Sequence, residues 1–104
     1  MDDLEVCRLS AEALGKVIET DAAPKDAVWV QGPNGERWVY WNPLTNAEQR
    51  WECVERLLER GSIVLSRTIG HGVYSGGQLF PEITCPAAEF PARAVAEIRR
   101  RDGS

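Results

Sequence analysis

The sequence predicts an α+β fold: one small domain over residues 1–104 in which helices pack on an antiparallel four-stranded sheet. Three observations lead to this prediction. Three segments have apolar residues at helical spacing, two runs rich in Val, Trp and Tyr flank a Gly-Pro-Asn-Gly sequence, and further strand-like runs follow the second helical segment. The expected order of elements is α-β-β-α-β-β-α.

The first helix is expected over residues 3–19. Apolar residues recur there at every third or fourth position, and charged residues fall between them. The apolar set is Leu4, Cys7, Ala11, Leu14 and Ile18. Gly15 weakens this helix, because glycine inside a helix costs about 1 kcal/mol relative to alanine.

A β-hairpin is expected next, with strands at residues 27–31 and 37–41. The sequence between them contains Asn34-Gly35, a pair that readily adopts the positive φ angles of tight turns. In the second strand Trp38 and Tyr40 point to one face of the sheet and their neighbours point to the other. Helices over both faces are the simpler expectation, whereas an uncovered face would leave a stacking platform or a subunit interface.

The second helix is expected to follow Pro43, which has no amide hydrogen and therefore ends the preceding strand. Thr45 and Glu48 are spaced as a capping box, in which each side chain bonds the backbone amide of the other residue. Gly61 is expected to end the helix. The predicted core stripe consists of Ala47, Trp51, Val54, Leu57 and Leu58.

Two strands and a helix complete the predicted fold. We expect a strand at residues 62–68, a turn at residues 69–72, and a strand at residues 73–83 that Gly76 and Gly77 bend or bulge. The last helix is expected over residues 88–101, with Pro91 in its first turn. Its predicted inner face consists of Phe90, Ala94, Val95 and Ile98.

The composition excludes several classes of function. The net charge of −4 and the pI near 5.0 argue against general binding to nucleic acid or anionic membrane, because both depend on positive potential. No apolar run reaches the roughly 18–20 residues of a membrane span, and the N-terminal segment has acids where a signal peptide has a basic region. We therefore expect a cytoplasmic protein.

The three cysteines, Cys7, Cys53 and Cys85, are odd in number and widely spaced. Neither a disulfide framework nor a zinc site is predicted from such spacing. Buried free thiols are the expected state, since free cysteine is among the most buried residue types. We expect no metal and no cofactor.

The only histidine, His71, lies in a glycine-rich segment beside Tyr74 and Ser75. A hydrolase that uses His71 with Ser75 or Tyr74 is one hypothesis, but no Gly-x-Ser-x-Gly sequence is present and no orienting carboxylate can be assigned. The glycines could present backbone amides to a phosphate, although no Gly-Lys-Ser or Gly-Lys-Thr sequence follows them. A turn with a positive φ angle at Gly70 or Gly72 explains the glycines more simply.

Three motifs together resemble a family of small phage and prophage proteins, the phage ABA sandwich domain. They are the Ala-Glu-Ala-Leu-Gly sequence at residues 11–15, the Asn-Pro-Leu-Thr-Asn turn at residues 42–46, and the Pro-Ala-Arg-Ala-Val-Ala sequence at residues 91–96, which corresponds to a closing helix of the type Pro-x-Ala-x-x-Ala. The resemblance covers most of the chain, and its motifs are structural. The glycine-rich segment at residues 70–77 departs from the family pattern.

The resemblance implies a phage-encoded protein in the cytoplasm of a bacterial host, without catalytic activity, that acts in host takeover or counter-defence. Small phage proteins of this kind occupy a host defence protein or sequester a nucleotide signal. In the second case we expect a homo-oligomer with ligand pockets between subunits. The candidate ligand contacts are Arg67, His71, Tyr74, Gly76, Gly77 and Trp41. The alternative is a protein–protein inhibitor that resembles anti-CRISPR proteins and meets a basic host surface with its acidic helix faces.

Overall fold

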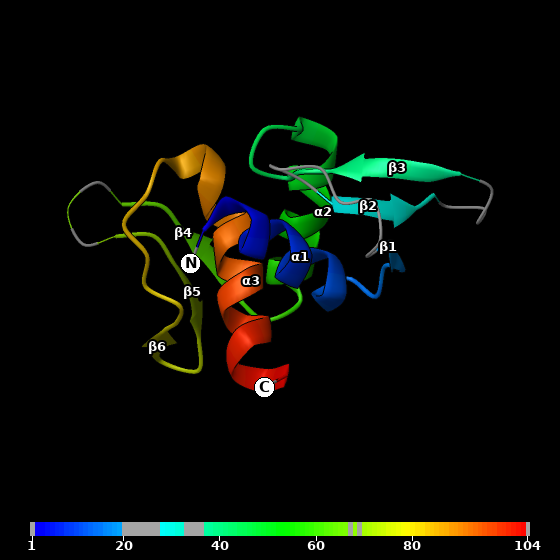
Figure 1. Ribbon diagram of the computed structural model, residues 1–104. Helices are drawn as coiled ribbons and strands as arrows, with labels where there is room; N and C mark the ends of the chain where they lie inside the picture. Colours follow the sequence, from blue (N-terminus) through cyan, green and yellow to red (C-terminus); the bar gives the residue numbers. More distant parts are fainter. Residues whose placement is uncertain (1, 20–27, 33–36, 67, 69, 104) are drawn as a thin grey trace.

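Three helices form the centre of the molecule, and a small antiparallel sheet lies at each end (Figure 1). This computed structural model describes residues 2–19, 28–32, 37–66, 68 and 70–103. The helices are α1 (Asp3–Ala13), α2 (Ala47–Leu58) and α3 (Phe90–Gly103), and the short 3₁₀ helix η1 (Ala87–Glu89) leads into α3. Helix α3 packs against both α1 and α2.

The first sheet, sheet A, has the strand order β1-β2-β3, with β1 (Ile18–Glu19), β2 (Val28–Gln31) and β3 (Trp38–Trp41). The second, sheet B, has the order β4-β5-β6, with β4 (Ser62–Val64), β5 (Gly72–Ser75) and β6 (Gln78–Leu79). The strand pairings of the described residues are all antiparallel. The hairpin predicted at residues 27–31 and 37–41 is confirmed within the described residues; residue 27 and residues 33–36 between the strands lie outside them.

The single four-stranded sheet of the prediction is wrong, because the two hairpins form separate sheets. One cause is the side chain of Gln49 in α2, which occupies the outer edge of β3. Its Nε2 donates to the carbonyl of Tyr40 (2.5 Å) and its Oε1 accepts from the backbone amide of Asn42 (2.7 Å). A primary amide thus takes the place of a neighbouring strand. The second cause is α2, which carries the chain about 18 Å between the hairpins.

Helix α1 ends at Ala13, earlier than the predicted residue 19. Gly15 adopts a φ angle of 72°, its amide donates to the carbonyl of Glu12, and the amide of Lys16 donates to the carbonyl of Ala11. This pair of bonds is the Schellman motif that commonly ends helices. Gly15 is therefore the residue that stops α1, and Ile18, predicted to lie on the helix, belongs to β1.

The N-cap of α2 is Asn46, one residue later than the predicted Thr45. The Asn46 side chain accepts from the amide of Gln49 (3.0 Å). Asparagine is as good an N-cap as serine and better than threonine, which explains why the helix begins there. The predicted partner Glu48 lies in the first turn, where its negative charge is favourable near the positive end of the helix dipole.

The strand predicted at residues 73–83 is two strands, β5 and β6, joined by the turn Gly76-Gly77. The φ angles are 59° at Gly76 and 84° at Gly77. Positive values at both central residues are those of a type I′ turn, the two-residue connection that matches the twist of a hairpin. The turn was predicted to extend to Gly72, but Gly72 is the first residue of β5. Of Gly70 and Gly72, for which a positive φ angle was predicted, Gly70 has it.

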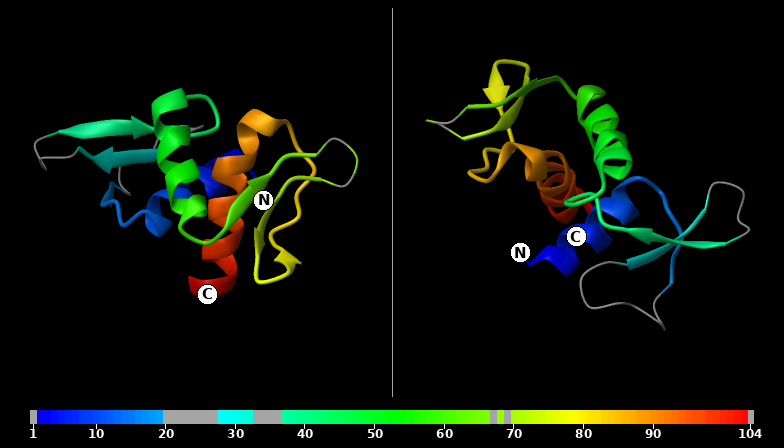
Figure 2. Two further views of the ribbon diagram at one scale, coloured as in Figure 1. Left: turned by 180° about the vertical axis from the view of Figure 1, so that it is seen from behind. Right: turned by 90° about the horizontal axis from the view of Figure 1, so that it is seen from above.

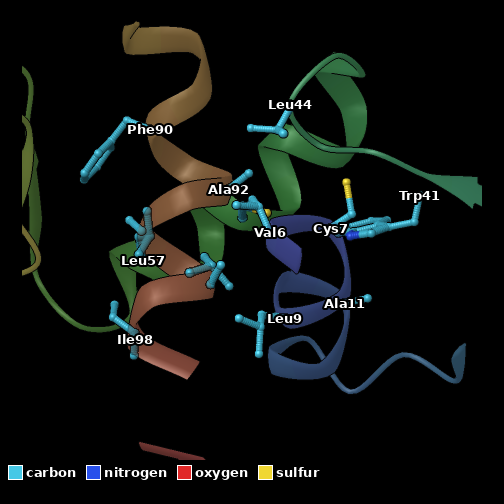
Figure 3. Close-up of a cluster of buried hydrophobic side chains, with 14 of the residues drawn as sticks. Val6, Cys7, Leu9, Ala11, Trp41, Leu44, Leu57, Phe90, Ala92 and Ile98 are labelled. Atoms are coloured by element: carbon cyan, nitrogen blue, oxygen red, sulfur yellow. The ribbon is translucent and has the colours of Figure 1, made fainter. Parts of the chain in front are cut away.

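The core lies where the three helices meet and continues under both sheets (Figure 3). The predicted inner face of α3 is confirmed, since Phe90, Ala94, Val95 and Ile98 are all buried. Alanines at several of the buried positions of α3 let the backbones of α1 and α3 approach closely. Among the described helices, none is both long enough and apolar enough to cross a membrane.

Candidate functional site

The predicted ligand contacts do not form one pocket in the chain. Tyr74, Gly76 and Gly77 lie together in the β5–β6 hairpin, where Tyr74 is exposed and no atom approaches the open side of either glycine within 4 Å. Arg67 lies outside the described residues. His71 precedes β5, three residues from Tyr74, so the two side chains point to opposite faces.

His71 is a buried structural residue whose two ring nitrogens are both engaged. The amide of Ser66 donates to Nδ1 (3.0 Å), and Nε2 lies 2.8 Å from the carbonyl oxygen of Cys85. Because a carbonyl oxygen only accepts, the hydrogen of the neutral ring is on Nε2. The backbone of His71 also exchanges both hydrogen bonds with Ile83. His71 therefore ties three segments of chain together.

The predicted hydrolase pairs are separated along β5. His71 and Ser75 are four positions apart along the extended chain, a distance of about 13 Å. No hydrogen bond joins His71 to Ser75 or Tyr74 among those of the described residues. The ring of His71 instead packs in a T-shaped arrangement with Phe90 in the core, with ring centroids 5.6 Å apart.

Trp41 belongs to sheet A and Tyr74 belongs to sheet B, and the two sheets lie at opposite ends of the molecule (Figure 1). Its side chain is 1% exposed, and its indole nitrogen donates to the Ser10 hydroxyl (3.0 Å), which in turn donates to the carbonyl of Cys7 (3.0 Å). This chain of bonds fastens sheet A to α1. The ammonium group of Lys16 lies 4.8 Å from the centre of the Trp41 ring.

The cysteines are free thiols; Cys7 and Cys53 are buried, as predicted, whereas Cys85 is partly exposed. Burial, helped by the nearby Glu52 carboxylate, raises the pKa of the Cys53 thiol to about 12. Such a thiol stays protonated at neutral pH and is a poor nucleophile or metal ligand. Within the described part of the chain, no group of His, Cys, Asp and Glu side chains is arranged to hold a metal ion.

Among the described residues, no helix covers the outer face of sheet A. Trp38 and Tyr40 of β3 are 42% and 43% exposed, and the register of the sheet places Tyr40 opposite Trp29 on the same face. The rings of Trp29 and Tyr40 meet edge to face, with centroids 4.8 Å apart. The expectation that helices cover both faces is therefore wrong for these described residues, and an aromatic surface is left exposed.

A second exposed surface lies on α2, which runs along one face of the molecule between the two sheets (Figure 2). Trp51 is 59% exposed and Leu58 is 54% exposed. The two residues are seven positions apart, so they stand one above the other on the same side of the helix. We call this side, with the glutamates that flank it, the outer face of α2.

The outer face of α2 is acidic around these two apolar side chains. The four glutamates are Glu48, Glu52, Glu55 and Glu59. Glu52 pairs with Lys16 at 3.0 Å and Glu59 pairs with Arg56 at 3.2 Å. No ion pair involves Glu48 or Glu55 among the described residues. The surface thus combines an exposed indole with uncompensated negative charge.

The prediction that Trp51 and Leu58 lie in the core is wrong. The residues of α2 that α3 and the core bury are Cys53 and Leu57. The apolar side chains of α2 span a wider arc of the helix than the part that packs against α3 and the core. Trp51 and Leu58 lie on the part of this arc that faces solvent. A signal for this was present in the sequence, because the glutamates at positions 48, 55 and 59 lie on the Trp51 side of the helix and away from Cys53.

Comparison of the chain with protein-family models, with curated proteins and with solved structures finds no match. The resemblance to the phage ABA sandwich domain therefore stays a prediction.

Proposed function

We propose that this chain is a non-enzymatic binding protein that recognises another protein through the outer face of α2. The single observation on which the proposal depends is the exposure of Trp51 and Leu58 at positions where the sequence pattern expects core residues. Exposed apolar side chains on an ordered helix mark interaction sites when they lie together and are rimmed by polar groups. Tryptophan is also the residue type most enriched at binding hot spots.

The glutamates around Trp51 indicate the chemistry of the partner. A surface that complements the outer face of α2 has an apolar pocket for Trp51 and Leu58 and basic side chains that meet Glu48 and Glu55. The spacing of seven residues between the two apolar side chains is that of a helix lying in a groove. Because the charges lie at the rim, they accelerate association and make it sensitive to salt.

The outer face of α2 supports this proposal better than the aromatic surface of sheet A does. The exposed part of sheet A is a few short strands wide, and the charged side chain that the register places beside its aromatic residues is Glu19, opposite Trp29. The outer face of α2 has both an apolar anchor and a charge pattern. An inhibitor with acidic helix faces is thus the hypothesis that the geometry favours, and nucleotide sequestration by an oligomer stays a prediction.

The resemblance stated above supports a bacterial host as the source of the partner. We propose that the chain occupies a basic surface of a host protein and so blocks it. A basic groove of a protein that binds nucleic acid has the required chemistry.

The test is affinity capture from a bacterial lysate with the tagged wild-type chain and with W51A/L58A. We expect the wild-type chain to retain a defined host protein that the double variant loses, and we expect retention to fall at least tenfold between about 0.05 and 0.5 M salt. Quantitative mass spectrometry of the eluates measures both effects.

Two matched variants make the capture specific to the surface. W38A/Y40A removes the exposed aromatics of sheet A, and Y74A removes the exposed aromatic of sheet B. Both variants should retain the same host protein as the wild-type chain. Loss of that protein with W38A/Y40A or with Y74A, and not with W51A/L58A, would contradict the proposal and move the binding surface to the corresponding sheet.

A further inference from the structure

A groove of about 430 Å³ lies between the inner face of sheet A and the first turns of α2. Trp41 and Val39 line it from β3, and Glu48, Gln49 and Glu52 line it from α2. A space of this size is within the range of sites that bind small molecules or single side chains. The groove shares Glu48 and Glu52 with the outer face of α2.

Lys16 lies in the groove in the position of an internal ligand. Its ammonium nitrogen is 4.8 Å from the centre of the Trp41 ring and 3.0 Å from Oε1 of Glu52. An aromatic ring together with a carboxylate is the combination that recognises an ammonium or guanidinium group. The site is therefore built for a cation, and in the free chain the cation comes from the chain itself.

The attachment of Lys16 allows it to leave this position. Its backbone is held by the Schellman motif that ends α1, through the bond from its amide to the carbonyl of Ala11 (3.0 Å). The side chain extends from there beyond the helix on four flexible methylene groups. Movement of the side chain into solvent thus breaks one partly exposed ion pair and one cation–π contact, and it leaves the Schellman motif intact.

The charges of the groove favour a further cation. Of the charged residues that line it, Glu48 and Glu52 are acidic and Lys16 alone is basic. Glu48 is in no ion pair within the described part of the chain. A guanidinium group has five N–H donors in a plane, so it can stack on an indole and bond a carboxylate at the same time, which an ammonium group does less well.

We propose that the groove binds an arginine side chain of the partner protein, in the position that Lys16 holds in the free chain. The incoming guanidinium stacks on Trp41 and bonds Glu52, Glu48 provides a second carboxylate, and Lys16 moves to solvent. This inference rests on the proposed function, because the arginine is one of the basic groups that meet the outer face of α2.

The experiment uses N-acetyl-argininamide as the probe and N-acetyl-citrullinamide as its neutral control. The two molecules differ in charge and are close in shape. Two-dimensional ¹H–¹⁵N NMR of the uniformly labelled protein resolves the indole N–H signals of the four tryptophans, and W41F assigns the signal of Trp41. We expect a saturable shift of the Trp41 signal with argininamide and none with citrullinamide.

Two variants test the exchange of cations. Lys16→Gln removes the internal competitor; if Lys16 occupies the site about 90% of the time, argininamide should bind about tenfold more tightly to this variant. Glu52→Gln should remove the saturable shift. The other three indole signals report whether each variant keeps the wild-type fold.

A Trp41 signal that stays fixed in both the wild-type chain and Lys16→Gln would overturn the inference, as would an equal response to citrullinamide. Failure of this experiment with retained dependence of capture on Trp51 would remove the arginine site and leave the proposed function intact. If the capture experiment fails but the Trp41 signal shows a saturable, charge-dependent shift, the proposed function is removed and the arginine site stays.

Discussion

Trp41 and Trp51 allow the same substitution to be compared in the core and on the surface. In Trp41→Phe the indole N–H that donates to Ser10 is lost, which costs about 1 kcal/mol. The smaller ring also buries about 50 Å² less apolar surface, worth about 1 kcal/mol, and the space it leaves adds to this cost. We expect the free energy of unfolding to fall by about 2–3 kcal/mol, and the melting temperature to fall by roughly 10–20 °C.

Trp51→Phe is the matched control, since the Trp51 side chain is 59% exposed. We expect its free energy of unfolding to stay within about 0.5 kcal/mol of the wild-type value. Urea unfolding followed by circular dichroism at 222 nm measures both variants without depending on tryptophan fluorescence. A larger loss of stability for Trp51→Phe than for Trp41→Phe would refute the assignment of one tryptophan to the core and the other to the surface.

Three further predictions concern the core and the edges of the sheets. The free energy of unfolding should fall as the pH rises from 9 toward 12, by up to about 1.4 kcal/mol per pH unit. The reason is that the unfolded chain loses the Cys53 thiol proton near pH 9, whereas the folded chain keeps it to about pH 12. Urea midpoints across this range measure the slope. Gly61→Ala should destabilise the fold by about 2 kcal/mol or more, since the added methyl group meets the carbonyl of Tyr74, as thermal unfolding will show. Gln49→Ala should cost about 1–2 kcal/mol and promote self-association by opening the edge of β3, which size-exclusion chromatography at several concentrations detects.

Each of these predictions has an outcome that contradicts it. In Cys53→Ala the free energy of unfolding should fall less steeply between pH 9 and 12 than in the wild-type chain. An unchanged slope would assign the pH dependence to other groups. A Gly61→Ala variant as stable as the wild-type chain would mean that Gly61, which precedes β4, does not approach Tyr74 of β5 as closely as described. A Gln49→Ala variant that stays monomeric at high concentration would show that the side chain is not what closes this edge.

Local patterns in the sequence were enough to predict α3 and the β2–β3 hairpin. The inner face of α3 follows from helical spacing alone, since Phe90, Ala94 and Ile98 recur at every fourth position of the helix. The hairpin follows from two β-rich runs around a glycine-containing turn. Both elements are decided by residues close together in the chain.

The separation into two sheets depends on hydrogen bonds between a side chain and the backbone at a strand edge. Contacts of this kind leave no pattern of apolar and polar residues in the sequence. The edge of β3 is closed by the side chain of Gln49, nine positions after Tyr40, and no pattern of hydrophobicity reports such a bond. A hairpin predicted from sequence carries no information on which of its edges stays open. The prediction therefore joined two hairpins that the structure keeps apart.

The surface of α2 could not be predicted for a related reason. The apolar arc of the helix extends from Cys53 and Leu57 to Trp51 and Leu58, and spacing reveals the width of that arc. Which part of it is buried depends on where α3 meets the helix. The glutamates on the Trp51 side were the one local sign that this part faces solvent.

The most direct test of the outer face of α2 as a binding surface is photo-crosslinking in living bacterial cells. A photoreactive phenylalanine derivative replaces Trp51 in one variant and Tyr74, an exposed aromatic of sheet B, in another. We predict that irradiation links position 51 to a single host protein with a basic surface and leaves position 74 without a product. Crosslinks from position 74 alone, or the same products from both positions, would contradict the assignment of the binding surface to α2.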